Sequence, residues 1–350
     1  MSDLQRSSSA KVACVNEGGI VLRGTGELLS DKRRNGKERP WAEYKSQSLI
    51  YAAALRRLGY EKKSERVLEC GSFLVFQECI LGHEKRLSSA HFCGTRLCMP
   101  CTWRKSLKIS ANVFKVAHVA LDRYPTYRFL VLTLTIPNTE ADELREGVDV
   151  LFKSWDRLIK RVEVQRAISG YFRALETTYN VESNTWHPHI HVLLFVPAGY
   201  FKKDYIKRDR WLELWQECTR IPSITQLDIR SVKNKGDTHE TLAAVVAEVA
   251  KYAVKPGPRG KEHPYIRATD KETDTAVEQL LNGLKGRRLT QFGGVLREIH
   301  KQLNLKDDPE KADLVHIDED ASLSPVCSVC GQLLTEHLYR WNRGIENYVG

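Results

Sequence analysis

Residues 186–196 read WHPHIHVLLFV, an apolar run whose first half carries a histidine at every second position. Side chains alternate across a β-strand, so we expect His189 and His191 on one face and Ile190 and Val192 on the other. The apolar residues that follow are typical of a central, buried strand. Two imidazoles side by side on a rigid sheet form half of a metal site. An isolated His-x-His pair also occurs at the end of an ordinary strand, so the histidines alone do not decide.

Further strands are predicted on both sides of this run in the sequence. Residues 127–137 form an unbroken series of β-branched, aromatic and leucine residues that ends at a proline. Residues 171–179 are predicted to pair with 186–196 across a polar turn, and residues 224–232 are predicted as another strand. Residues 289–296 suggest a turn that packs on the core.

Glu176 is an acidic residue in the otherwise apolar and hydroxyl-bearing strand 171–179. A carboxylate buried there needs a compensating charge, and a metal shared with His189 and His191 would supply it. The alternative is a surface glutamate on an edge strand.

Amphipathic helices are expected between the strands, because apolar residues recur there at helical spacing. The segments are 45–63, 140–164, 201–218 and 238–255. In the last of them Glu248 and Tyr252 are four residues apart, so their side chains share one face, and Lys255 follows three residues later on the same side. Without the histidines, Tyr252 would be interpreted as a core aromatic residue.

Nine cysteines occur in the chain. In a reducing compartment, clustered cysteines favour zinc over disulfides. Cys98 and Cys101 have the spacing of a zinc knuckle, and Cys93 lies close enough to join them. Cys70 is favoured as the fourth ligand. A redox pair is the alternative to a metal site, and the competing fourth ligands are Cys79, His83 and His91.

The helix expected after Cys101 carries three basic residues that either contact phosphate or form a solvated face, Arg104, Lys105 and Lys108. Near the end of the chain, Cys327 and Cys330 form half of a candidate second zinc knuckle. Its remaining ligands are open, with His316 or His337 as candidates.

The composition favours a polyanionic partner. The chain carries 54 Lys and Arg against 44 Asp and Glu, a formal net charge of +10, and its pI is near 9.1. This excess of positive charge favours nucleic acid over a membrane surface as the partner. No apolar run approaches the length of a membrane span, and residues 1–10 lack the apolar core of a signal peptide. We therefore expect a cytoplasmic protein with no membrane partner.

Taken in order, these motifs resemble the plasmid rolling-circle replication initiators of the HUH endonuclease superfamily. The resemblance rests on the strand 129–135 (FLVLTLT), the run 187–192 (HPHIHV), the segment 248–255 (EVAKYAVK) and the cysteine-rich segment 92–104. It covers residues 68–256, and the cysteine segment is similar to the branch of replication proteins with an N-terminal zinc segment.

The resemblance implies an α+β fold, with an antiparallel central sheet of the ferredoxin-like or RRM-like kind flanked by helices. We expect four regions: a flexible basic arm (1–44), a helical and zinc-binding segment (45–120), an HUH nicking domain (121–300), and an acidic linker with the possible second zinc knuckle (301–350).

The resemblance also implies a chemistry. Tyr252 would attack a DNA phosphate, leaving a 5′-phosphotyrosine and a free 3′-hydroxyl that primes synthesis. His189, His191 and Glu176 would hold Mg²⁺ or Mn²⁺, with zinc purely structural at the cysteines. Glu248 would activate water or a second nucleophile at termination, and Lys255 would favour the phenolate. His187 would either lie just outside the metal ligands or replace one of them as a ligand.

The expected partners are origin DNA, presented as a single strand or hairpin with flanking duplex, and the host helicase and replication machinery, because no Walker A motif is present. The sequence leaves the oligomeric state open. The alternatives are an HUH transposase or mobilisation relaxase, and a zinc-dependent DNA-binding regulator without catalysis.

Overall fold

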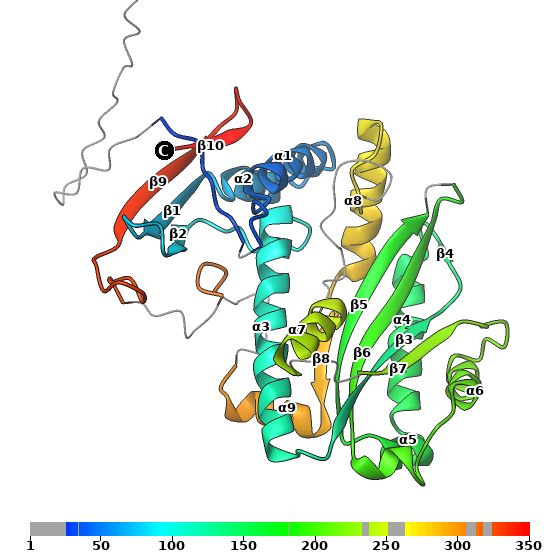
Figure 1. Ribbon diagram of the computed structural model, residues 1–350. Helices are drawn as coiled ribbons and strands as arrows, with labels where there is room; N and C mark the ends of the chain where they lie inside the picture. The colour runs from blue at the N-terminus through cyan, green and yellow to red at the C-terminus, as the bar shows by residue number, and fades with distance from the viewer. Residues whose placement is uncertain are drawn as a thin grey trace, which may run out of the picture.

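The computed structural model contains two antiparallel sheets joined and covered by helices (Figure 1), which confirms the expected α+β class. It describes residues 26–33, 35–180, 182–232, 238–250, 263–305, 313–317 and 324–350. No helix in these described ranges combines the length and the apolar character needed to cross a bilayer.

The larger sheet is built around the histidine run, which forms strand β6 (Thr185–Val196). Its strand order is β7-β3-β6-β5-β8, all antiparallel, and β4 also pairs with β6. The strands are β3 (Arg128–Thr135), β4 (Thr139–Glu140), β5 (Gly170–Asn180), β7 (Leu227–Ser231) and β8 (Thr290–Gly293). The predicted strands are therefore confirmed, and β6 lies at the centre of the sheet as its apolar sequence indicated.

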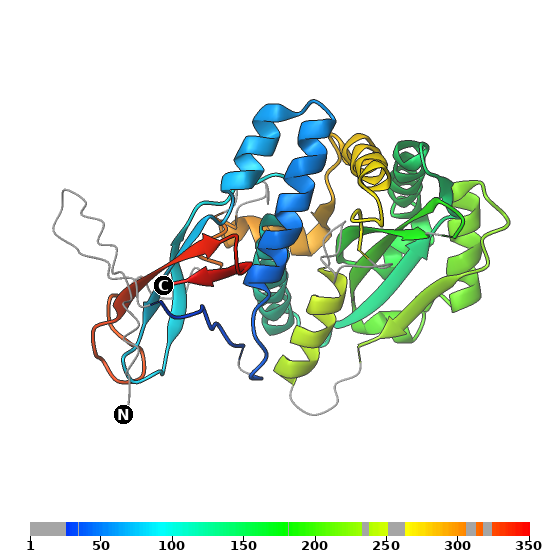
Figure 2. The same ribbon diagram turned by 90° about the horizontal axis from the view of Figure 1, so that it is seen from above.

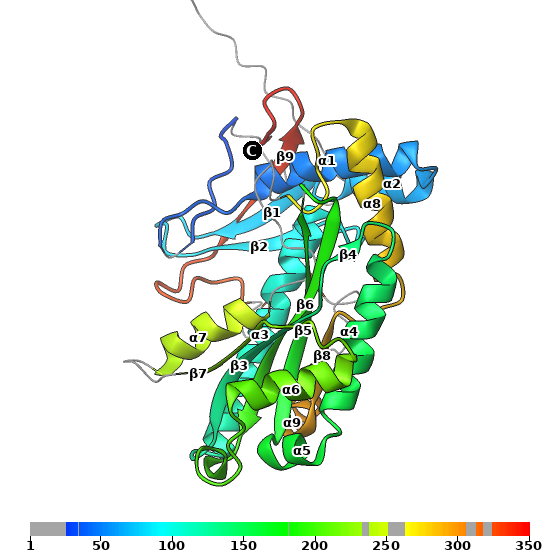
Figure 3. The same cartoon turned by 90° about the vertical axis from the view of Figure 1, so that its right-hand side faces the viewer.

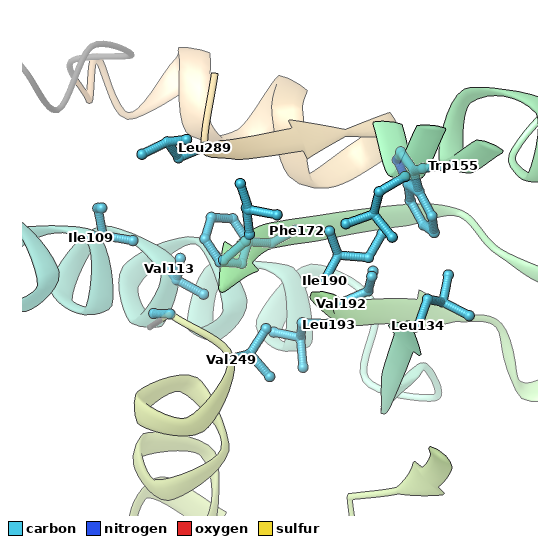
Figure 4. Packing of buried hydrophobic residues seen from close by; sticks show 14 of the residues in the cluster. Ile109, Val113, Leu134, Trp155, Phe172, Ile190, Val192, Leu193, Val249 and Leu289 are labelled. Atoms are coloured by element: carbon cyan, nitrogen blue, oxygen red, sulfur yellow. The ribbon is translucent and has the colours of Figure 1, made fainter. Parts of the chain in front are cut away.

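One face of this sheet carries the histidines, and helices α3 (Met99–Arg123), α7 (Thr238–Val249) and α9 (Gly294–Gln302) lie on that side. Figure 4 shows Val249 beside Leu193 and Val113 beside Phe172. Phe172 and Leu193 are paired across β5 and β6, and residues that are paired across antiparallel strands share a face.

Helix α4 (Leu144–Leu158) covers the opposite face, where Trp155 contacts Tyr171 edge-on. Helix α6 (Arg208–Thr219) packs beside α4 and, in Figure 3, crosses in front of the sheet. The short elements near them are α5 (Val162–Ala167) and the 3₁₀ turn Ala198–Phe201.

The smaller sheet has the order β10-β9-β1-β2, so strands from the two ends of the chain lie side by side. They are β1 (Phe73–Glu78), β2 (Lys85–Ala90), β9 (Thr335–Asn342) and β10 (Asn347–Val349). A second apolar cluster attaches this sheet to α3 through Phe76, Trp41 and Trp103. Leu28, in the segment expected to be an arm, bridges to Val349.

Three helices fill the space between the sheets (Figure 2). Helices α1 (Trp41–Arg57) and α2 (Glu61–Glu69) pack on each other, and α8 (Asp270–Leu284) contacts α1 and α4. A capping box of Thr269 and Glu272 starts α8, and the Arg57 guanidinium of α1 donates to the Asp274 carboxylate of α8.

Three sequence expectations about these elements are wrong or incomplete. Residues 45–63 are two helices, because Gly59 adopts φ +79° and ends α1. Residues 140–164 likewise divide, at a turn after Leu158, into α4 and α5. Residues 289–296 contain strand β8 and the start of α9, because the segment bonds to the edge of β5 and Gly294 then turns with φ +57°.

Candidate active site

The strand register places the predicted metal ligands next to one another. Glu176 of β5 is directly opposite His189 of β6, and Ala174 is opposite His191. Residues paired in this way share a face, so Glu176 projects from β5 on the same side as both histidines. The predicted juxtaposition of the three side chains is present.

The three side chains converge on one point. The Glu176 Oε2 atom lies 3.0 Å from His191 Nε2 and 3.7 Å from His189 Nε2. One potential ligand atom from each residue lies within 4.8 Å of the other two. Only 5% of Glu176 is exposed, which excludes a surface carboxylate.

The other ring nitrogen of each histidine is held in place. His189 Nδ1 lies 3.2 Å from the carbonyl oxygen of His187, which can only accept, so His189 carries its proton on Nδ1. His191 Nδ1 lies 3.2 Å from the Thr133 hydroxyl of β3, which can accept or donate. Sequence reasoning missed Thr133, although a hydroxyl at alternate positions of residues 128–135 was a signal for it.

These contacts fit a bound cation. With its proton on Nδ1, a neutral His189 points the lone pair of Nε2 at the Glu176 carboxylate. Two acceptors facing one another are stable only with a proton or a metal ion between them. A mixed imidazole and carboxylate set suits a divalent ion such as Mn²⁺, and would also accept zinc.

His187 lies on the same strand face but is not a member of the three-residue group. Its Nε2 contacts the Thr135 hydroxyl, and its ring stacks on His189 with centroids 5.2 Å apart. Burial, and then the neighbouring His189, lower the pKa of His187 below its ordinary value. The lowered pKa favours the neutral form of His187, whose ring packs against the ring of His189.

Helix α7 approaches this side of the sheet through its last residues. Buried Val249 lies beside Leu193 (Figure 4), and Leu193 follows His191 by two residues and so shares its face. Glu248 is in the last turn of α7, and its side chain lies outside the described residues. Tyr252 and Lys255 also lie outside them.

The four predicted zinc ligands meet in the second constellation. The Cys70 sulfur lies 3.5 Å from those of Cys98 and Cys101, and the Cys93 sulfur lies 3.6 Å from Cys101. Sulfurs held about 2.3 Å from a tetrahedral zinc are about 3.8 Å apart, so these separations fit the ion. Backbone N–H groups of Gly94 and Thr95 donate to two of the sulfurs, a further feature of thiolate sites.

Two buried lysines accompany the four cysteines. Lys45 donates to the carbonyl oxygens of Leu68 and Cys70, and Lys105 donates to the carbonyl of Gly94. Burial lowers the pKa of Lys45, while nearby Cys70 and Cys98 oppose that shift. Zinc with four thiolates carries a net charge of −2, so cations in contact with the site reduce the cost of burying it.

The expectation that the basic residues of α3 contact phosphate or solvent is wrong. Arg104 donates to the carbonyls of Leu314 and Val315, and Lys108 donates to those of His316 and Ile317. These side chains, like that of Lys105, are buried. Arg104 and Lys108 hold residues 314–317 against helix α3.

The C-terminal pair Cys327 and Cys330 also joins a group, with Cys79 and His83. His337 is not part of that group, since it lies within β9 opposite Phe76. His316 instead contacts Asp313.

The comparisons with known proteins agree with one another. A family model described as "Replication protein" matches residues 84–349. "Protein rep" of Streptococcus pneumoniae serotype 2 is 37% identical over 298 residues, covering 84% of this chain and 88% of the relative. "Protein rep" of Bacillus amyloliquefaciens is 35% identical over 342 residues, covering 92% and 97%. "Protein rep" of Lactiplantibacillus plantarum is 34% identical over 327 residues, which cover 92% of this chain and 98% of the relative. No solved structure matches the chain.

Proposed function

Because the chain belongs to the family of Rep replication proteins, we propose that it initiates rolling-circle replication of a plasmid by nicking one strand at the origin. The observation that carries this proposal is the convergence of Glu176, His189 and His191 on one sheet face. A metal-binding triad on a rigid central sheet is suited to holding a phosphate for attack.

In this proposal Glu176, His189 and His191 hold Mg²⁺ or Mn²⁺. The bound ion would polarise the scissile phosphate and stabilise the charge that develops on its oxygens. Thr133 and the His187 carbonyl orient the two imidazoles, so that both Nε2 atoms face the carboxylate.

Tyr252 is the proposed nucleophile. Its phenolic oxygen forms a bond to phosphorus, and the bond from phosphorus to the 3′-oxygen breaks. The leaving 3′-oxygen takes up a proton and becomes the primer hydroxyl, while the 5′-phosphate stays on the tyrosine. Tyr252 follows Val249 by three residues, and three residues of chain span at most about 11 Å. The packing of Val249 against Leu193 supports a location within reach of the histidines.

Glu248 and Lys255 have supporting roles in this scheme. Lys255 favours the phenolate of Tyr252 through its positive charge. At termination Glu248 removes a proton from water or from a second nucleophile, which then releases the protein from the DNA. The partner is origin DNA, and the net charge of +10 favours its phosphates.

A denaturation-resistant adduct tests the proposal. The protein is incubated with Mn²⁺ and labelled single strands carrying the cognate origin sequence, and adducts are separated under denaturing conditions. Tyr252→Phe should abolish the adduct and retain DNA binding. Tyr205→Phe is the matched control, because Tyr205 is exposed in the loop before α6, and it should form the adduct as the parent does.

Other results would contradict the proposal. An unchanged adduct in Tyr252→Phe removes this residue as nucleophile. DNA binding with no adduct in the parent protein would favour the regulator without catalysis.

A further inference from the structure

Two turns from opposite ends of the chain meet at one end of the smaller sheet. The first, Cys79–Glu84, connects β1 to β2, and the second, Cys327–Gly331, precedes β9. Strands β1 and β9 are paired, with Glu78 opposite Thr335, so both turns adjoin the same end of this pair. Figure 1 shows β9 and the β1–β2 hairpin lying alongside one another.

Three sulfurs and one imidazole occupy the place where the turns meet. The Cys79 sulfur lies 3.6 Å from that of Cys330 and 3.7 Å from His83 Nδ1. All four ligand atoms, including that of Cys327, lie within 4.8 Å of one another. A tetrahedral zinc with Zn–S near 2.3 Å and Zn–N near 2.05 Å would place sulfurs about 3.8 Å apart and sulfur and nitrogen about 3.6 Å apart.

A glycine with positive φ closes each turn. In the first, Gly82 adopts φ +73° and donates its N–H to the Cys79 carbonyl. In the second, Gly331 adopts φ +70° and donates to the Cys327 carbonyl. Glycine adopts this left-handed conformation without the steric cost that other residues meet, so each turn can close tightly beside its ligands.

One carboxylate joins the two turns. The Glu84 Oε2 atom accepts hydrogen bonds from the backbone N–H and the hydroxyl of Ser328, at 3.0 and 3.2 Å. These two hydrogen bonds hold the turns together beside His83. Glu84 itself is not one of the four ligand residues.

Apolar packing does not explain why the turns meet. The largest apolar side chains at their tips point to solvent: Ile80 is 78% exposed, Leu81 58% and Val329 68%. Cys79 and Cys327 are nevertheless buried. Cys330 is half-buried and His83 is exposed, so three thiols and an imidazole converge near the surface while the apolar side chains point away from them. This is the arrangement of a metal site rather than of an apolar core.

We propose that Cys79, His83, Cys327 and Cys330 bind a second structural zinc ion, with His83 as the imidazole ligand in place of His337. Three thiolates and one imidazole in a closed set are a zinc-selective combination. The ion fastens the start of β9 to the end of β1, and so joins the C-terminal strands to the segment that carries the first cysteine group. This site is independent of the proposed nicking reaction.

Zinc content per chain, measured by elemental analysis of purified variants, tests the site. Cys330→Ser and His83→Ala should each lose about one zinc relative to the parent protein. His83→Cys, which restores a fourth ligand, should keep the parent content. His337→Ala is the control and should also keep it. Comparing each variant with the parent removes any contribution from zinc held by Glu176, His189 and His191.

A second measurement does not depend on variants. X-ray absorption at the zinc edge of parent protein that carries two zinc ions per chain should give about 3.5 sulfur and 0.5 nitrogen ligands per zinc, the mean of a Cys₄ and a Cys₃His site. Hydrogen exchange in Cys330→Ser should be faster at Thr335, beside the site, than at Arg340, at the far end of the paired stretch.

Three results would overturn the proposal. The first is parent zinc content in both Cys330→Ser and His83→Ala. The second is loss of zinc in His337→Ala with retention in His83→Ala. The third is a parent protein whose zinc has four sulfur ligands and no nitrogen.

Discussion

Replacing Thr133 by valine should weaken binding of a divalent ion at Glu176, His189 and His191. The hydroxyl of Thr133 lies 3.2 Å from His191 Nδ1 and holds the ring with Nε2 toward Glu176. Valine has the same shape but cannot hydrogen-bond. Loss of such an outer partner of a metal-binding histidine costs about 10–100-fold in affinity, which is about 1.4–2.7 kcal/mol.

Thr135→Val is a control on the same strand. Thr135 contacts His187, which is not in the three-residue group. Each substitution removes the hydroxyl partner of one imidazole nitrogen. This loss lowers the stability of the metal-free protein by about 1–3 kcal/mol. Stability should therefore fall similarly in both variants, while metal affinity should fall only in Thr133→Val.

Calorimetric titration of metal-free protein with Mn²⁺ measures the affinity, and thermal unfolding with a chelator present measures the stability. Equal Mn²⁺ affinity in Thr133→Val and the parent would refute the role of this hydroxyl. An equal loss in Thr135→Val would show that His187 contributes to the site.

Three more substitutions test the Glu176 carboxylate, the turn at Gly294 and the first cysteine group. Glu176→Gln removes the negative ligand and should reduce Mn²⁺ affinity more than Thr133→Val does, in the same titration. Gly294→Ala should destabilise the fold more than Gly286→Ala, in denaturant unfolding. Both glycines have positive φ, which costs alanine about 1–2 kcal/mol, but only at Gly294 would the new Cβ meet backbone, at 2.2 Å from the Ser169 oxygen. Cys98→Ser should lose zinc and unfold at lower temperature than Cys218→Ser, which removes a buried cysteine outside both groups.

The central sheet was predictable because its signals are local. Strands β3 and β6 are long apolar runs, and the alternation of His189 and His191 gives their shared face without knowledge of the partner strand. The partnership of Glu176 with these histidines required the pairing of β5 with β6, which the short polar turn between them indicated.

The smaller sheet was not predictable in the same way, because its partners are distant in sequence. Cys79 and Cys330 are separated by 251 positions, and no local pattern indicates that the turn after β1 meets the turn before β9. His337 was a reasonable candidate by spacing, but its place within β9 directs it to other neighbours.

Other expectations were wrong because a single residue or a distant contact outweighs the periodic pattern. Gly59 interrupts an apolar stripe that otherwise continues, since its positive φ ends the helix whatever follows. Arg104 and Lys108 are charged, so the sequence alone predicts that their side chains face solvent. Their burial depends on backbone carbonyls near residues 314–317, which only the tertiary structure provides. The capping box at Thr269 was a readable signal for α8 that the sequence expectations did not use.

Peptide mapping of the covalent adduct tests the central claim most directly. The protein is incubated with the cognate single strand and Mn²⁺, digested with protease and nuclease, and analysed by tandem mass spectrometry. The account predicts a nucleotide joined through its 5′-phosphate to Tyr252. A nucleotide joined to any other residue, or a cleaved strand with no residue modified, would contradict it.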